Sequence, residues 1–454
     1  MENLWKLLNF GTRFQLTPIT YTEFHTQLEL TDKPNIFKLD VNCFNEIFDY
    51  LSLKDLCSIG QSCREMQRIA GEYFMRNYEL SLKLSTKNGI YTVYSDHGAI
   101  NIHILTSSFN PFINCITIKH EDLEPIRYIH MHNSEFASIN EIDLVCLTID
   151  AAKVKNLRKI LPKIEVMKVN QCAVKGDFYK LLKHCTSLKR LYVQHDLGYI
   201  IAKDAKWMER NYPKLEKLHL TPQHPFRIHG LYTFFQHNPN IRSFSTSSRC
   251  LWDCRNQILA CRAQLNRLEI HICDNYYFNL IDMQLICCLL NQLYERNFYK
   301  SLHLYAKRVD QQFCEQLCSV SGLERLSIKQ FSECYNLPRL VNLKELLLNG
   351  RISRGDIEIL ANSLWNLEYL SISNVTSADI LPFMRHSVNL CKIYAHLNDE
   401  TLHLKKLNKE REKLNRACKV TIYVTSNIFL ATKWATTHGV TNLNLVEMKR
   451  ADMH

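Results

Sequence analysis

Apolar residues recur from about residue 113 to residue 450 in one short pattern, apolar-x-x-apolar-x-apolar. Clear copies begin at Ile164, Leu188, Leu215, Leu265, Leu323, Leu343 and Leu367. Weaker copies begin at Leu144, Ile241, Tyr299, Leu390 and Ala417, and the series ends at Leu443 and Leu445. Because side chains alternate between the two faces of a strand, each copy predicts a short strand with one buried face.

The spacing of these copies is regular. Successive copies begin 20 to 27 residues apart, and one step of 34 residues contains an apolar helix expected over 281–293. Helical segments such as 177–185 and 356–364 lie between the strands. An ordinary α/β sheet would have longer apolar strands and no fixed period. The pattern and period resemble leucine-rich repeats, which stack into a curved solenoid because no single unit can bury its apolar face.

Residues 39–74 follow a different pattern, with apolar positions every three or four residues as on one face of a helix. Asp40 is placed to cap a first helix over 41–51, and Ser52 with Asp55 forms a capping box for a second helix. A third helix is expected after Cys63. Helices this short need a partner or the rest of the chain to fold. Periodicity alone favours a simple helical cap on whatever follows in the chain.

The residue identities in this stretch resemble the F-box family. Asp40, Ser62 and Met66 stand where that family has Pro, Val and Trp, and Asp caps a helix start about as well as Pro begins one. The matching positions follow in register without a gap; they are Leu39, Cys43-Phe44, Ile47-Phe48, Tyr50-Leu51, Asp55-Leu56 and Cys63-Arg64.

The combined resemblance is to an F-box protein with leucine-rich repeats. It implies an α/β fold, in which a three-helix F-box precedes a curved solenoid with parallel strands on the concave side and helices on the convex side. The implied function is that of a non-catalytic substrate-recognition subunit of an SCF-type (Skp–cullin–F-box) ubiquitin ligase. Its F-box would bind a Skp-family adaptor and, through it, a cullin–RING core. The adaptor-binding residues would be Leu39, Phe44, Ile47, Phe48, Leu51, Leu56, Ile59, Cys63, Arg64 and Met66.

Two other readings remain open at this stage. One is a repeat-based binding scaffold or inhibitor that acts outside a ubiquitin ligase, in which the helices only cap the repeats. The other is an enzyme carried on the repeats, but no strained Gly-x-Ser-x-Gly turn, glycine-rich phosphate loop or HExxH motif is present. We therefore expect no catalytic residues and no cofactor.

The strand positions between the core residues are expected to point to the concave surface. Basic and aromatic residues outnumber acids there, which favours an acidic or phosphorylated segment of a target protein as the ligand. The alternative is that these residues merely keep the solenoid soluble. The expected target-binding residues are Arg190, Tyr192, Lys217, His219, Arg267, His271, Arg325, Lys329, Lys392 and Tyr394.

Composition narrows the picture further. The net charge of +11 is spread along the chain, so it does not by itself indicate nucleic acid. The 18 cysteines include no CxxC pair, which leaves a zinc site without support and favours reduced thiols in the cytoplasm or nucleus. No secretory signal and no run of about 20 apolar residues is present, so we expect no membrane span.

The expected domain division has four parts. Residues 1–35 form an N-terminal extension and residues 36–78 the F-box. Residues 79–140 form a linker and an N-terminal cap of the solenoid, with alternating strands over 79–112, and residues 141–454 form the leucine-rich repeats.

Overall fold

The computed structural model describes residues 35–77, 83–87, 90–95, 98–119, 124–175, 178–194, 206–221, 230–272, 280–331, 336–399, 401–436 and 440–451. The chain divides into an N-terminal unit, residues 1–50, and a repeat unit, residues 51–454. The N-terminal extension predicted for residues 1–35 lies outside the described residues, except for Asn35.

The N-terminal unit contains the short 3₁₀ helix η2 (Asn35–Lys38) and helix α2 (Val41–Phe48). Asp40 caps α2 as predicted, because its Oδ1 accepts a hydrogen bond of 2.8 Å from the N–H of Cys43. The helix is shorter than the 41–51 predicted from periodicity. It ends at Phe48, and Asp49 and Tyr50 form a turn in which the Tyr50 N–H bonds back to the carbonyl of Ile47.

The repeat unit begins with helices α3 (Leu53–Gly60) and α4 (Arg64–Asn77). The antiparallel strands β1 (Lys83–Lys87), β2 (Ile90–Ser95) and β3 (Gly98–Asn101) follow them. The prediction of alternating strands over 79–112 is wrong beyond Asn101, where helix α5 (Ile102–Phe109) begins. The Asn101 side chain caps α5 by accepting from the N–H of His103, and the helix buries Ile102, Leu105 and Phe109.

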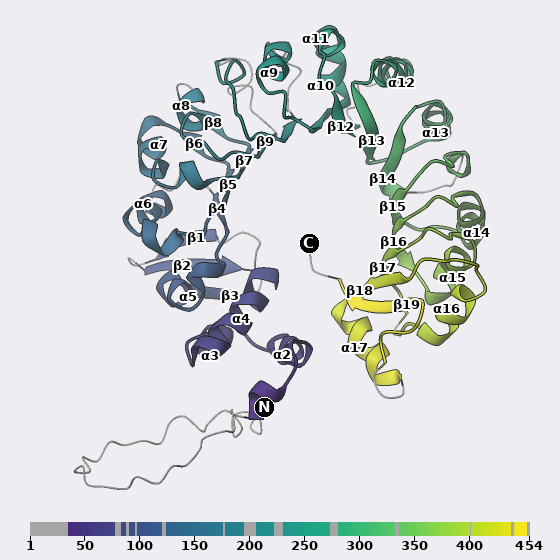
Figure 1. The fold of residues 1–454 in the computed structure, drawn as a ribbon, viewed down its shortest axis with the longest axis horizontal. Coiled ribbons are helices and arrows are strands. Elements are labelled where there is room, and N and C mark those ends of the chain that lie inside the picture. Colours follow the sequence, from purple (N-terminus) through teal and green to yellow (C-terminus); the bar gives the residue numbers. More distant parts are fainter. Residues whose placement is uncertain are drawn as a thin grey trace. The chain divides into compact units, whose positions relative to one another are not determined.

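Parallel strands of the repeat unit form a continuous ladder, which follows the inner side of an arc in Figure 1. Fourteen such strands lie within the described residues. They are β4 (Cys115–Lys119), β5 (Glu141–Val145), β7 (Val166–Asn170), β9 (Arg190–Gln194), β10 (Lys217–Thr221), β11 (Ser243–Ser247), β12 (Leu265–His271), β13 (Tyr299–Ala306), β14 (Leu323–Phe331), β15 (Glu345–Gly350), β16 (Tyr369–Val375), β17 (Lys392–Leu397), β18 (Val420–Val424) and β19 (Val446–Arg450). The ladder therefore begins before residue 141, where we expect the repeats to start.

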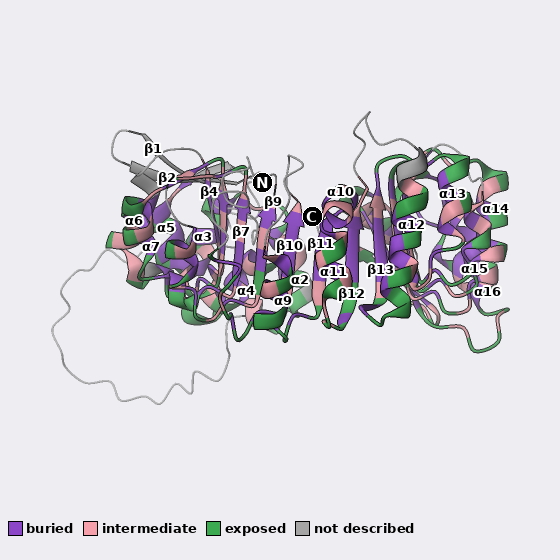
Figure 2. Ribbon diagram, turned by 90° about the horizontal axis from the view of Figure 1, so that it is seen from above, coloured by how far each residue is buried: buried purple, intermediate pink, exposed green. Residues whose placement is uncertain are grey.

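Equivalent core positions lie side by side on neighbouring strands of the ladder, as the repeat pattern predicts. Leu191 pairs with Leu218, which pairs with Phe244, and the row continues through Leu268 to Leu302. All five side chains are fully buried. Buried residues recur along the strands of the ladder in Figure 2. Stacking these rows gives the repeats one shared core.

Helices connect the strands and cover the outer side of the arc (Figure 1). These helices vary in length from one turn to four turns. The strands are therefore more alike from repeat to repeat than the segments that connect them. The helices are α6 (Glu124–Met131), α7 (Ala151–Leu157), α8 (Tyr179–Leu182), α9 (Leu231–His237), α10 (Ser248–Asp253), α11 (Arg255–Ala260), α12 (Leu280–Glu295), α13 (Gln311–Leu317), α14 (Arg354–Ser363), α15 (Ser377–His386), α16 (Leu404–Arg411) and α17 (Ser426–Ala435). The 3₁₀ helices η3 (Asn110–Phe112), η4 (Asn133–Phe136), η5 (Leu161–Lys163) and η6 (Leu337–Arg339) and the strands β6 (Thr148–Ile149) and β8 (Ala173–Val174) complete the connections.

The last predicted strand is displaced. Leu443 and Leu445 are only half-buried, and the N–H of Leu443 bonds to the carbonyl of Val446 in a turn. The strand that completes the ladder is β19, in which Val446 and Met448 are the buried residues. The α/β solenoid predicted from the sequence is thus confirmed, with this shift at its end.

Candidate functional site

The helical stretch predicted to bind an adaptor presents an apolar surface at its start. In the N-terminal unit, Leu39 is 40% exposed and Val41 is 45% exposed. Tyr50 is 66% exposed, and Ile47 is half-buried. Phe44 and Phe48 are buried, with ring centroids 5.9 Å apart. Isolated apolar residues are common on surfaces, but several on one short segment mark a place where a partner can bind.

The rest of the stretch belongs to the repeat unit. Ser52 caps α3 as predicted, since its Oγ accepts from the N–H of Asp55 at 3.2 Å. Leu56 and Met66 are buried, whereas Leu51 and Ile59 are half-buried and Cys63 and Arg64 are exposed. The predicted adaptor-binding residues therefore include both interior and accessible side chains. The sequence analysis left Val41 and Tyr50 out of this set, although both lie beside residues of the family pattern.

Helices α3 and α4 pack directly against α5 and η3 within the repeat unit. Phe74 of α4 stacks on the buried Phe109 of α5, with ring centroids 5.0 Å apart. Gln61 Nε2 donates to Ser107 Oγ and Ser108 Oγ at 3.0 Å each. A Cβ on Gly60 would lie 2.7 Å from the Phe109 ring, so glycine permits this close approach.

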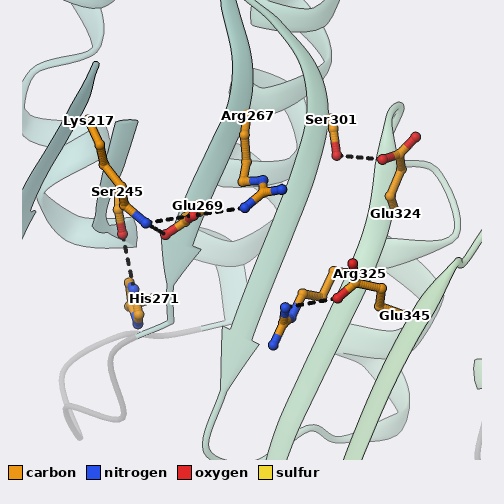
Figure 3. Close-up of polar contacts among 9 residues, drawn as sticks. All are labelled: Lys217, Ser245, Arg267, Glu269, His271, Ser301, Glu324, Arg325 and Glu345. Atoms are coloured by element: carbon orange, nitrogen blue, oxygen red, sulfur yellow. Dashed lines mark hydrogen bonds and ion pairs between the residues drawn. The ribbon is translucent and has the colours of Figure 1, made fainter. Parts of the chain in front are cut away.

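The predicted target-binding residues lie on the strands of the ladder, and Figure 3 shows their central part. Strand register places Tyr192 beside His219 and Arg325 beside His303, so residues far apart in sequence are neighbours. Lys329 is exposed near the end of β14, where the register with β15 is irregular. We call the surface that these predicted target-binding residues form on the strands of the ladder the concave face.

Glu269 is the acidic centre of the concave face. Its two carboxylate oxygens each accept a 2.9 Å hydrogen bond from Lys217 Nζ, and Arg267 Nη1 lies 3.8 Å from Oε1 (Figure 3). Burial alone would raise the pKa of Glu269, but Lys217 and its hydrogen bonds bring that pKa below its ordinary value. Lys217 is thus already neutralised by a residue of the same chain.

Histidines surround this ion pair. His271 Nε2 lies 3.2 Å from Ser245 Oγ, and its ring stacks on Tyr305 with centroids 4.7 Å apart. His219 is almost fully buried between Tyr192 and His271, at centroid distances of 5.5 and 5.3 Å. Burial, above all, lowers the pKa of His271. The His271 ring is therefore neutral near pH 7 and adds a polar contact rather than a charge.

Other basic residues of the concave face differ in whether they are paired. Arg325 Nη1 bonds to Glu345 at 2.8 Å. Arg190 and Lys392 are exposed and form no ion pair within the described residues. The expected basic surface is consequently reduced by acidic partners, and its role in target binding stays a prediction.

His303 provides a pH-dependent prediction. It is 3% exposed, and burial followed by Arg267 and Arg325 lowers its pKa from 6.5 to about 4. Because protonation of His303 favours the unfolded chain, the contribution of the neutral ring to the free energy of unfolding is fully present above pH 6.5. This contribution is lost as the pH falls toward 4. The loss is about 3 kcal/mol at about 1.4 kcal/mol per pKa unit. Urea unfolding between pH 7 and pH 4 should show this loss in the wild type and not in His303→Gln; equal pH dependence in both would contradict it.

No group of three or more His, Cys, Asp or Glu side chains suited to a metal ion occurs in the part of the chain that the structure describes. Burial raises the pKa of Cys172 and of Cys185 to about 12. These thiols are therefore protonated near neutral pH and pack as small apolar groups. Among the described helices, none is long and apolar enough to cross a membrane.

The chain thus contains an N-terminal helical segment followed by a solenoid. A family model of the F-box domain matches residues 36–72, which cover α2, α3 and most of α4. The resemblance predicted for this stretch is confirmed, and the match supports an F-box protein. Comparison with curated proteins gives no match.

Two solved structures are similar to this chain at low identity. One is the Toll–Spätzle complex of Drosophila, with 12% identity and a TM-score of 0.28, covering 74% of this chain and 47% of that chain. The other is a protein of Bacteroides fragilis, with 15% identity and a TM-score of 0.20, covering 69% of this chain and 66% of that chain. The chain thus spans about half of the first and 66% of the second, and the fold assignment rests on the ladder itself.

Proposed function

We propose that this protein is the substrate-recognition subunit of an SCF-type ubiquitin ligase. Its F-box would bind a Skp-family adaptor and, through it, a cullin–RING core, while the concave face holds a target protein. The observation that carries this proposal is the F-box domain match at residues 36–72, joined to a solenoid with an extended concave face.

The role of the protein in this proposal is proximity. Ubiquitin transfer would be performed by other subunits, and the repeats would raise the effective concentration of target lysines near the conjugating enzyme. The packing of α3 and α4 against α5 supports this role, since it connects part of the F-box to the solenoid without a flexible linker.

Adaptor binding provides the direct test. A full-length Leu39→Glu/Tyr50→Glu double variant places charge on two exposed apolar residues. We expect it to reduce co-purification of the Skp adaptor at least tenfold, because introducing charge at two apolar anchors should cost at least about 1.4 kcal/mol of binding free energy in total. The matched control is Trp365→Glu, which changes an aromatic residue that is 56% exposed and lies outside the F-box.

The outcomes separate the proposal from its alternative. Adaptor capture by the wild type and by the Trp365→Glu variant, but not by the double variant, supports an SCF receptor. Absence of adaptor binding by the wild-type chain would favour a scaffold or inhibitor that acts outside a ligase.

A further inference from the structure

The C-terminal part of the concave face presents a stack of tyrosines. Tyr369 of β16, Tyr394 of β17 and Tyr423 of β18 follow one another across neighbouring strands. Ring centroids are 5.5 Å apart for the first pair, and 4.3 Å apart for the second pair, whose rings are inclined by only 8°. All three side chains are half-buried, so each ring keeps an accessible part. We call these three residues the tyrosine ladder.

Elsewhere on the concave face, cations of the same chain lie over the tyrosine rings. Lys168 Nζ and Lys217 Nζ are 6.0 and 5.6 Å from the centroid of Tyr192, and the Arg325 guanidinium is 5.5 Å from that of Tyr305. Within the described part of the chain, no such cation lies over Tyr369 or Tyr423. Tyr369 and Tyr423, the two outer rings of the tyrosine ladder, thus offer ring surface that no described cation of the chain covers.

The charges beside the tyrosine ladder are mostly compensated. Arg325 pairs with Glu345 at 2.8 Å, and Lys449 pairs with Glu447 at 3.3 Å. Lys392 is exposed, forms no ion pair with any described residue, and lies next to Tyr369 in the strand register. An apolar aromatic surface with one unmatched positive charge therefore faces the concave side.

We propose that the tyrosine ladder and Lys392 bind an extended segment of the target protein that carries an aromatic and an acidic residue two positions apart. Lys392 and Tyr394 are alternate residues of β17, so their side chains leave the same face about 7 Å apart. Alternate side chains of an extended ligand have the same separation. The aromatic ring stacks on the ladder, and the carboxylate pairs with Lys392. This inference rests on the proposed function, because it takes the concave face as the target-binding surface.

A random dodecapeptide display library, selected on the immobilised full-length chain, tests the proposal. Selected peptides should be enriched in aromatic-x-acidic or acidic-x-aromatic pairs. Their affinities, measured by fluorescence anisotropy, should fall at least tenfold with Tyr394→Ala and with Lys392→Glu. The matched controls Trp365→Ala and Lys405→Glu change an exposed aromatic and an exposed lysine outside the concave face, and should leave the affinities unchanged.

Further measurements keep the outcomes distinct. Thermal unfolding of each variant monitors the fold, and Tyr394→Leu removes the ring while keeping an apolar side chain. Failure to select peptides, peptides without the pair, or affinities insensitive to Tyr394→Ala and Lys392→Glu would overturn the proposal. Tyr394-dependent binding of oligothymidylate in place of peptide would also overturn it, because bases stack on aromatic rings as well. Adaptor capture is measured on the same preparations, so intact peptide binding without adaptor capture refutes the ligase role alone.

Discussion

Replacing Arg411 with methionine is expected to lower the free energy of unfolding of the full-length chain by about 3–5 kcal/mol. Arg411 is completely buried at the end of α16. Its guanidinium donates to the carbonyls of Ser387, Val388 and Leu390 at 2.6 to 2.9 Å, and to that of Cys418 at 3.1 Å. One side chain thus holds together the end of α15 and the starts of β17 and β18.

The expected loss follows from the acceptors that remain. Methionine fills most of the volume of the arginine stem but donates no hydrogen bond, so buried carbonyls lose a partner. Burial also lowers the pKa of Arg411, which shows that the cation itself is costly to bury, and removing it offsets part of the loss. Urea denaturation gives the change directly.

The control for Arg411→Met is Arg385→Met. Arg385 is 42% exposed and bonds to Glu410 at 3.0 Å, so its loss should cost less than about 1 kcal/mol. Equal midpoints for the two variants would contradict the structural role of Arg411.

A Gly60→Leu variant is expected to destabilise the chain by about 3 kcal/mol. Even a Cβ at this position would lie 2.7 Å from the ring of Phe109, which is fully buried and cannot move aside without disturbing Phe74. The effect should appear as a lower thermal midpoint and as earlier proteolysis between α3 and α5.

Gly355→Leu provides the matched comparison, because Gly355 is an exposed residue of α14. A Cβ there meets only Ser353 Oγ at 3.9 Å, so the variant should be neutral or stabilised by up to about 1 kcal/mol through its better helix propensity. A Gly60→Leu chain as stable as Gly355→Leu would show that α3 does not pack closely on α5.

The sequence predicts the strands of this fold well because their signal is local. The apolar positions of the clear copies of the repeat motif, such as Leu188, Leu191 and Val193, are buried. The helix caps at Asp40 and Ser52 depend on residues only three positions away, and both are present. One prediction fails because a local pattern conflicts with longer-range contacts. The sequence of Ile102–Leu105 alternates as in a strand, but the Asn101 cap and the contacts of α5 with α3 make this segment helical.

The contacts of the concave face that depend on the register between strands could not be predicted from such local patterns. The residues of the Lys217–Glu269 pair are 52 positions apart, and they meet only because β10, β11 and β12 lie side by side. The stack of Tyr394 on Tyr423 likewise follows from the pairing of β17 with β18. The burial of Arg411 depends on carbonyls from two separate loops, the one between α15 and β17 and the one between α16 and β18, which no periodicity encodes.

The close packing of Phe109 has a practical consequence for dividing the chain. A fragment that begins at residue 79 would remove α3 and α4, leaving the Phe109 ring without Phe74 and Ser108 without Gln61. Such a fragment would expose a new apolar surface on α5, at the start of the solenoid, and would tend to aggregate. Expression trials of the repeats should therefore retain residues 51–77, even where binding to the adaptor is not wanted.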